Sequence, residues 1–191
     1  MRFSLLLLGV LALQCVSVSA QPVLFAQRNA RDYSNHLAPY VVSPQSVVDM
    51  MLEMADLKPG EVIYDLGSGD GRILITAAQR YHARGVGIEI QDSLVKSSEE
   101  RIARLGLQNQ IHIIHADLRK VDLSPADVIT MYLMTESNES LRPKLEASLR
   151  PGARVVSHDY KVPGWKPTRQ ERAEAYSRDH VIYLYVMPPR K

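Results

Sequence analysis

The strongest constraint on the fold of this chain is a glycine-rich turn between an expected strand and an expected helix. Residues 62–66 are apolar enough for a short buried strand, and residues 71–81 have the apolar spacing of a helix. Between them, Gly67, Gly69 and Gly71 stand at every second position. A Cβ atom at these positions would block a tight turn and keep a ligand away from the backbone. The pattern therefore predicts a ligand-binding turn, with a plain glycine-rich loop as the simpler alternative.

Strand and helix signals alternate along the rest of the chain. Further strands are expected at residues 86–90, 111–116, 126–133, 153–157 and 181–186, and further helices at residues 46–55, 92–105 and 138–149. Residues 171–176 are expected to form a short antiparallel partner of the last strand. Such alternation predicts right-handed crossovers and a parallel sheet covered by helices on both faces. Ligands of such sheets bind at the carboxyl ends of the strands, where the glycine-rich turn is expected.

The spacing and charge of the turn distinguish two classes of cofactor. A dinucleotide site has the spacing G-x-G-x-x-G, and this chain has Arg72 where the third glycine would stand. A diphosphate also favours amides and a helix N-terminus, whereas Asp65 and Asp70 place two carboxylates beside the turn. Two carboxylates suit a ligand that bears an ammonium and a sulfonium group. We therefore expect S-adenosylmethionine (SAM) rather than a dinucleotide.

Two further acidic residues follow expected strands. Glu89 lies near the end of the second strand, where a carboxylate can accept hydrogen bonds from both hydroxyls of a ribose; an exposed charge at a strand end is the alternative. Asp117 follows the third strand, where its carboxylate and a neighbouring amide can hold an adenine edge; a turn or N-cap aspartate is the alternative. The predicted cofactor-binding residues are Asp65, Gly67, Ser68, Gly69, Asp70, Gly71, Glu89, Ile90, Asp117 and Leu118.

These motifs, in this order and strand context, resemble those of the class I, seven-stranded SAM-dependent methyltransferases. The resemblance extends from about residue 43 to residue 186. It implies an α/β fold: a Rossmann-like three-layer sandwich with a mostly parallel seven-stranded sheet and an antiparallel C-terminal strand.

A narrower set of motifs is similar to those of the small lysine methyltransferases that modify the c subunit of mitochondrial ATP synthase, and of their bacterial relatives. The segments that carry this similarity are residues 39–44, 65–73, 87–89, 152–155 and 163–165. The similarity implies that the Pro-Tyr-Val segment at residues 39–41 closes over the cofactor and that the methyl acceptor is a lysine side chain. Residues 131–134, Met-Tyr-Leu-Met, differ from the Phe-Gly-containing segment usual in that family.

Methyl transfer from a sulfonium mainly requires alignment of the nucleophile, so we expect no essential acid–base pair. Tyr40 and Tyr132 are the candidates for lining the methyl-transfer channel, with aromatic packing as the alternative for each. His158 and Asp159 end the fifth strand and are candidates for orienting a substrate amine, or form an ordinary polar strand end. Trp165 is expected to be either a lid or a core residue.

Composition excludes several classes of function. The net charge of +2 over 191 residues is too small to indicate a nucleic-acid partner. Cys15 is the only cysteine, which excludes a disulfide framework and a cysteine-ligated metal. The histidines show no metal-ligand spacing with carboxylates, so no catalytic metal is expected. No Asn-Pro-Pro-Tyr type motif follows the fourth strand, which argues against DNA adenine methylation.

The N-terminus has the order of a secretory signal: a basic start, an apolar stretch and small residues before Gln21. Residues 1–20 are therefore expected to be a signal peptide or, alternatively, an uncleaved membrane anchor. Residues 21–42 are expected to be a linker and residues 43–191 the methyltransferase domain. A cleaved signal predicts an exported protein, periplasmic or secreted, and an anchor predicts membrane association. We expect a monomer.

Three functions remain open at this point. The first is a protein methyltransferase that acts on lysine. The second is a small-molecule methyltransferase of the same fold. The third is a non-catalytic module that binds SAM or a nucleoside, which the export signal makes worth testing because SAM is made in the cytoplasm.

Overall fold

The computed structural model describes residues 37–189 of the chain. The expected signal peptide or anchor at residues 1–20, and most of the expected linker at 21–42, lie outside the described residues. Among residues 37–189, no helix has the length and apolar character needed to cross a bilayer.

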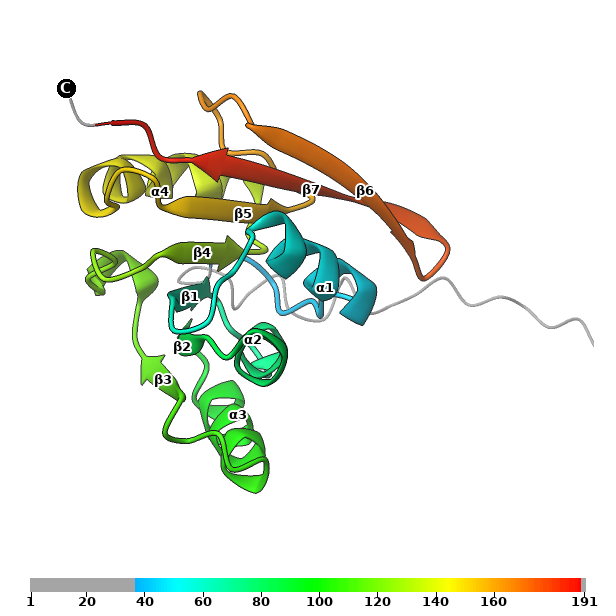
Figure 1. Ribbon diagram of the computed structural model, residues 1–191, viewed down its shortest axis with the longest axis vertical. Helices are drawn as coiled ribbons and strands as arrows, with labels where there is room; N and C mark the ends of the chain where they lie inside the picture. Colours follow the sequence, from blue (N-terminus) through cyan, green and yellow to red (C-terminus); the bar gives the residue numbers. More distant parts are fainter. Residues whose placement is uncertain (1–36, 190–191) are drawn as a thin grey trace, which may run out of the picture. The chain divides into compact units, whose positions relative to one another are not determined.

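Within these residues, seven strands form one mixed sheet in the order β3-β2-β1-β4-β5-β7-β6 (Figure 1). The first five strands pair in parallel, whereas β7 is antiparallel to both β5 and β6. The expected mostly parallel seven-stranded sheet with an antiparallel C-terminal strand is thereby confirmed. The strands are β1 (Val62–Leu66), β2 (Arg84–Glu89), β3 (Ile111–His115), β4 (Val128–Met131), β5 (Arg154–His158), β6 (Arg169–Ala175) and β7 (Arg178–Val186).

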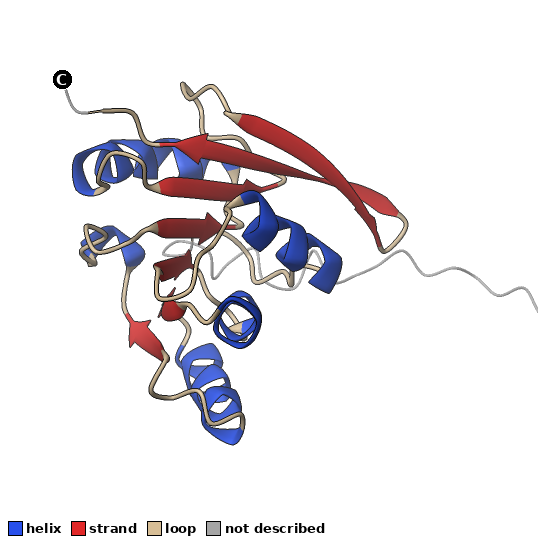
Figure 2. Ribbon diagram, in the orientation of Figure 1, coloured by secondary structure: helices blue, strands red, loops and turns tan. Residues whose placement is uncertain are grey.

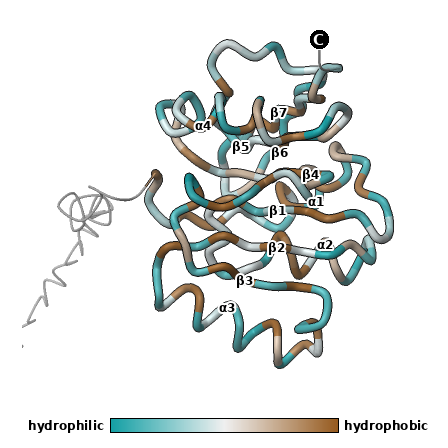
Figure 3. The backbone as a smooth tube through the Cα atoms, turned by 90° about the vertical axis from the view of Figure 1, so that its left-hand side faces the viewer, coloured by the Kyte–Doolittle hydropathy of each residue, from teal (hydrophilic) through white to brown (hydrophobic). Residues whose placement is uncertain are grey.

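Helices cover both faces of the sheet, and Figure 2 shows them flanking the strands. Apolar residues of α1 (Gln45–Met54), α2 (Arg72–Tyr81) and α3 (Asp92–Arg104) pack into one buried cluster. Those of α4 (Thr135–Ser148) and the short 3-10 helix η3 (Leu118–Lys120) pack into a second buried cluster. Figure 3 shows hydrophobic and hydrophilic residues alternating along α3, as expected for a helix with one buried side. The predicted three-layer sandwich follows from these two cores.

Two elements, α4 and β7, begin three residues earlier than the sequence predicts. Helix α4 begins at Thr135 rather than 138, and its first turn is held where Ser137 donates a hydrogen bond to the Leu37 carbonyl. Strand β7 begins at Arg178 rather than 181, because a two-residue turn at Tyr176 and Ser177 joins it to β6. Both turn residues have positive φ, the geometry that suits the twist of a hairpin.

The order of the strands positions the functional site. Strand β1 pairs with β2 on one side and with β4 on the other, so the chain reverses its direction of winding there. Connections leave the carboxyl ends of β1 and β4 toward opposite faces of the sheet, which opens a crevice at that edge. The glycine-rich turn lies at this point.

Candidate active site

The glycine-rich turn is anchored to the end of β2. The amides of Gly67 and Ser68 donate to the carbonyl oxygen of Ile88 at 2.9 and 3.1 Å. Gly69 has a φ of +52°, and a Cβ atom there would lie 2.6 Å from Cε2 of Tyr40. The Tyr40 ring therefore lies over the turn, and closure of its segment over the cofactor stays a prediction. Tyr40 itself is partly open to solvent, with 45% of its surface exposed.

Glu89 supports the same turn from the end of β2. Its Oε2 accepts from the Gly69 amide at 2.9 Å, and its Oε1 accepts from the amides of Ile90 and Gln91 at 2.8 and 2.9 Å. The side chain is buried, so it is not the exposed strand-end charge considered above. Each carboxylate oxygen has two acceptor positions, so these three bonds leave one position, on Oε2, for a hydroxyl of a ribose.

Asp65 is buried at the end of β1, where Thr130 of β4 donates a hydrogen bond to its Oδ1 at 2.8 Å. Burial raises the pKa of Asp65 to about 7, and the nearby carboxylates of Glu89 and Asp70 add to the rise. A cation bound beside Asp65 would lower this pKa again, because an opposite charge favours the ionised carboxylate. The surroundings of Asp65 therefore favour binding of a positively charged ligand.

Asp70 does not provide the free negative charge that was expected from the sequence. Its carboxylate forms ion pairs with Arg72 at 2.8 Å and with Arg101 of α3 at 2.9 Å. Burial opposes ionisation of Asp70, but the hydrogen bonds and charge of Arg72 hold its pKa below the ordinary value. Because two guanidinium groups balance this carboxylate, Asp70 contributes little net negative charge. The preference for a cationic ligand rests on Asp65 and Glu89.

Asp117 follows β3 and begins η3, where its carboxylate accepts from the Arg119 amide at 2.9 Å and pairs with the Arg119 guanidinium at 2.7 Å. The helix-capping alternative is therefore realised, and the residue also lines the cleft, as Leu118 does. Capping and cleft lining are compatible, so contact with adenine stays a prediction.

The predicted cofactor residues come together around one cleft. It holds about 880 Å³ of space, part of it open to solvent. Its lining includes the predicted residues Asp65, Gly67, Ser68, Gly69, Asp70, Glu89, Ile90, Asp117 and Leu118, together with Tyr40 and Tyr132. Gly71 is not in the lining: it precedes α2 with a φ of +74°, so its role is to shape the turn.

SAM fits the chemistry of this cleft. The Oγ of Ser68 is buried against Gly87 and has no hydrogen-bond partner within the described part of the chain, so the turn keeps one unsatisfied polar atom. Asp65 would hold a cationic group, and Glu89 would hold the ribose. When bound, SAM supplies a methyl group on a positively charged sulfur.

Tyr132 lies just after β4 and lines the cleft from the side of β5 and β7. Its hydroxyl donates to Oδ2 of Asp159 at 3.1 Å and accepts from Nη2 of Arg178 at 3.1 Å. Its ring stacks on His158 with the ring centroids 3.8 Å apart. Burial raises the pKa of Tyr132 to about 12, so the hydroxyl stays protonated at neutral pH.

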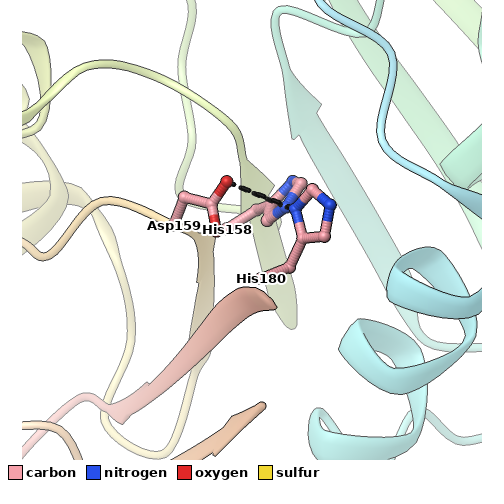
Figure 4. A group of neighbouring side chains, drawn as sticks. All are labelled: His158, Asp159 and His180. Carbon is pink, nitrogen blue, oxygen red and sulfur yellow. Dashed lines mark hydrogen bonds and ion pairs between the residues drawn. The ribbon is translucent and has the colours of Figure 1, made fainter. Parts of the chain in front are cut away.

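His158, Asp159 and His180 form a cluster whose ligand-type atoms lie within 4.8 Å of one another (Figure 4). The spacing of histidines and carboxylates along the sequence did not predict this cluster, because pairing of β5 with β7 brings His180 beside residues more than twenty positions away. The guanidinium of Arg178 also pairs with Oδ2 of Asp159. A fixed positive charge on the same oxygen disfavours a cation, so the cluster is better described as a hydrogen-bond network.

Trp165 is not part of the cleft. Its ring packs against Tyr185 with the centroids 5.4 Å apart, and its Nε1 donates to Glu146 of α4 at 2.7 Å. Of the two roles considered for Trp165, packing is the one realised.

Comparison with solved structures defines the class of protein. The chain superposes on a protein described as an RNA methyltransferase from Salinibacter ruber, solved in complex with S-adenosyl-L-homocysteine, with a TM-score of 0.74. The two are 42% identical, and the match covers 79% of this chain and 96% of the other. Together with the cleft described above, this shows a SAM-dependent methyltransferase.

The family follows from the sequence matches. The model of the ANTKMT methyltransferase domain matches residues 65–169, and the chain belongs to this family. A protein-lysine N-methyltransferase of Saccharolobus islandicus is 42% identical over 154 residues, which are 80% of this chain and 96% of that protein. An adenine nucleotide translocase lysine N-methyltransferase of Mus musculus is 34% identical over 129 residues. These matches confirm the resemblance to lysine methyltransferases inferred from the motifs. The match to the mouse protein covers 68% of this chain but only 56% of that relative.

Proposed function

We propose that this protein transfers the methyl group of SAM to the side-chain amine of lysine in a protein. The observation that carries the proposal is the similarity to the Saccharolobus protein, which is 42% identical along 96% of its length and is named for that reaction. The family match and the mouse relative support the same acceptor.

The cleft offers what a lysine acceptor needs. A lysine ammonium must lose a proton before its nitrogen can attack, and removal from water favours the neutral amine. Tyr40 and Tyr132 line the cleft with aromatic surface that would replace water around the side chain. Tyr132 stays protonated, so it acts through hydrogen bonding and position and not as a base. Alignment of this kind can lower a barrier by about 7–11 kcal/mol.

The Salinibacter relative makes RNA the main competing acceptor, since it is described as an RNA methyltransferase. RNA binding depends on cations that are free to meet phosphates. Around this cleft, Arg72 and Arg101 pair with Asp70, and Arg119 pairs with Asp117. These pairs, and a net charge of only +2, favour a protein acceptor.

Transfer of tritium from labelled SAM tests the proposal. The purified protein is incubated with total protein and total RNA from the source organism, and the products are treated with protease or ribonuclease. We expect protease-sensitive label in a small number of protein bands. Label sensitive only to ribonuclease would establish RNA as the acceptor, label only in small metabolites would indicate a small-molecule enzyme, and no label would indicate a binding module.

Matched variants show that the label depends on the cleft. Gly69→Arg places a large side chain against Tyr40 and should abolish transfer. Gly60→Arg changes another glycine with positive φ, where nothing lies within 4 Å of an added Cβ, and should retain transfer.

A further inference from the structure

The hydroxyl of Tyr132 is held in one orientation by charged neighbours. It donates to Oδ2 of Asp159 and accepts from Arg178, both at 3.1 Å. A tyrosine hydroxyl has one hydrogen and two acceptor lone pairs, so these two bonds leave one lone pair. Tyr132 lines the cleft, so this remaining lone pair is the one that a donor on the substrate would use.

A second acceptor lines the same cleft at Ser43. Its Oγ lies 2.9 Å from Nδ1 of His158, the ring on which Tyr132 stacks. Its carbonyl oxygen accepts from Nη1 of Arg72 at 2.9 Å, so the residue is held at two points. Whichever partner donates in the bond with His158, the Ser43 hydroxyl keeps at least one lone pair. Burial lowers the pKa of His158 to about 4, so this bond involves a neutral ring.

Asp159 contacts Tyr132 directly and contacts His158, the hydrogen-bond partner of Ser43. Its Oδ1 accepts from the Val181 amide at 2.9 Å, while its Oδ2 meets Tyr132, Arg178 and the His158–His180 pair. Its φ is +59°, a left-handed conformation that is uncommon outside glycine and that surrounding contacts must maintain. In this conformation, one carboxylate just after β5 contacts both the backbone of β7 and the hydroxyl of Tyr132.

We propose that Asp159 is a positioning residue that presents Tyr132, together with Ser43, as hydrogen-bond acceptors for the two N–H groups of the methyl-accepting amine. A neutral primary amine has two hydrogens and one lone pair, so engaging both hydrogens leaves the lone pair for the methyl group. This inference rests on the proposed function, because it assumes that the acceptor is an amine.

Asp159→Asn should reverse the direction of the hydrogen bond between residue 159 and the Tyr132 hydroxyl. Asparagine tolerates the left-handed conformation, and its single oxygen can replace Oδ1 in the bond with Val181. The amide nitrogen would then face both Tyr132 and Arg178. It cannot accept from the guanidinium, so the ion pair with Arg178 is lost. It can donate to the tyrosine oxygen, so the tyrosine hydrogen would turn toward the cleft. A donor would stand where the amine requires an acceptor.

A double-mutant cycle tests whether Asp159 acts through Tyr132. The purified full chain and its Tyr132→Phe, Asp159→Asn and doubly substituted variants are compared at saturating labelled SAM, with the total protein of the source organism as acceptor. Each single change should slow transfer about 10- to 100-fold, as expected for a misplaced nucleophile. The double variant should be no more than about threefold slower than the slower single variant, because coupled residues are not additive.

Three controls separate positioning from a structural defect. SAM affinity by calorimetry should stay close to that of the unchanged protein in every variant. Each variant should still unfold in one cooperative transition, with a lower melting temperature in Asp159→Asn because its ion pair with Arg178 is lost. Asp179→Asn makes the same chemical change on β7, the strand whose backbone Asp159 contacts, at a residue whose side chain is 63% exposed, and it should leave the rate unchanged. Ser43→Ala should slow transfer on its own without weakening SAM binding, which provides a second test if Asp159→Asn folds poorly.

The outcomes distinguish this inference from the proposed function. If the unchanged protein labels no protein, the proposed function fails, and the assignment of an amine acceptor fails with it. If it labels protein but the losses in the double variant multiply, or Ser43→Ala has no effect, the positioning role of Asp159 is overturned and the proposed function stands.

Discussion

Gly69→Ala is the smallest change that should separate cofactor binding from folding. The added Cβ would lie 2.6 Å from Cε2 and 3.2 Å from Cδ2 of Tyr40. The closer distance is about 1 Å short of an ordinary carbon–carbon contact, so the Tyr40 ring must move. Gly60→Ala is the matched control, because Gly60 also has positive φ but an added Cβ there meets nothing within 4 Å.

The expected magnitudes differ between stability and binding. Both alanines bear the cost of a left-handed conformation, about 1–2 kcal/mol. Tyr40 is 45% exposed, so its ring can move outward at small further cost to folding. Both variants should therefore lose a similar free energy of unfolding. SAM affinity should fall by at least about tenfold, or about 1.4 kcal/mol, in Gly69→Ala alone, because the methyl group and the displaced ring both alter the cleft.

Calorimetric titration with SAM and urea unfolding of the three proteins measure these quantities side by side. Unchanged SAM affinity in Gly69→Ala would refute the placement of the cofactor against the turn. An equal loss of affinity in Gly60→Ala would show that backbone strain alone explains the effect.

Other predictions concern titration, metal and processing. Because the pKa of Asp65 is raised to about 7 and a bound cation would lower it, SAM binding should release a proton and strengthen about tenfold from pH 6 to pH 8; a flat pH dependence in calorimetry would contradict the contact. In Asp65→Asn, binding should be weak at every pH. Prolonged dialysis against a chelator should leave the transfer rate unchanged, whereas a loss restored by Zn²⁺ would show that His158, Asp159 and His180 hold a metal. We propose that the N-terminal segment is cleaved as an export signal, so N-terminal sequencing of the native protein should begin at Gln21; a start at Met1 would contradict cleavage.

The parts of the site that were predicted from sequence depend on local pattern. The glycine turn, Glu89 and Asp117 each lie at or directly after the end of a strand, and parallel strands bring their carboxyl ends to one edge. The role of Glu89 could be predicted without knowledge of distant contacts, because its partners are the adjacent amides and the turn that it supports.

The parts that were missed depend on contacts between distant segments. Arg101 balances Asp70 from thirty-one positions away, where α3 lies beside the turn. Ser43, His180 and Arg178 meet at His158 and Asp159 only because β7 pairs antiparallel with β5 and α1 begins beside them. The spacing of residues along one sequence does not predict these contacts between distant segments. The candidate pair at the end of β5 was identified, but its partners required the sheet.

Chemical identification of the labelled amino acid tests the central claim most directly. Protein labelled with tritiated SAM is hydrolysed in acid, and the hydrolysate is separated against methylated amino-acid standards. We predict that the label co-migrates with Nε-methylated lysine and is absent when Gly69→Arg replaces the unchanged protein. Label in another methylated residue, or recovered from nucleosides and not from protein, would contradict the claim.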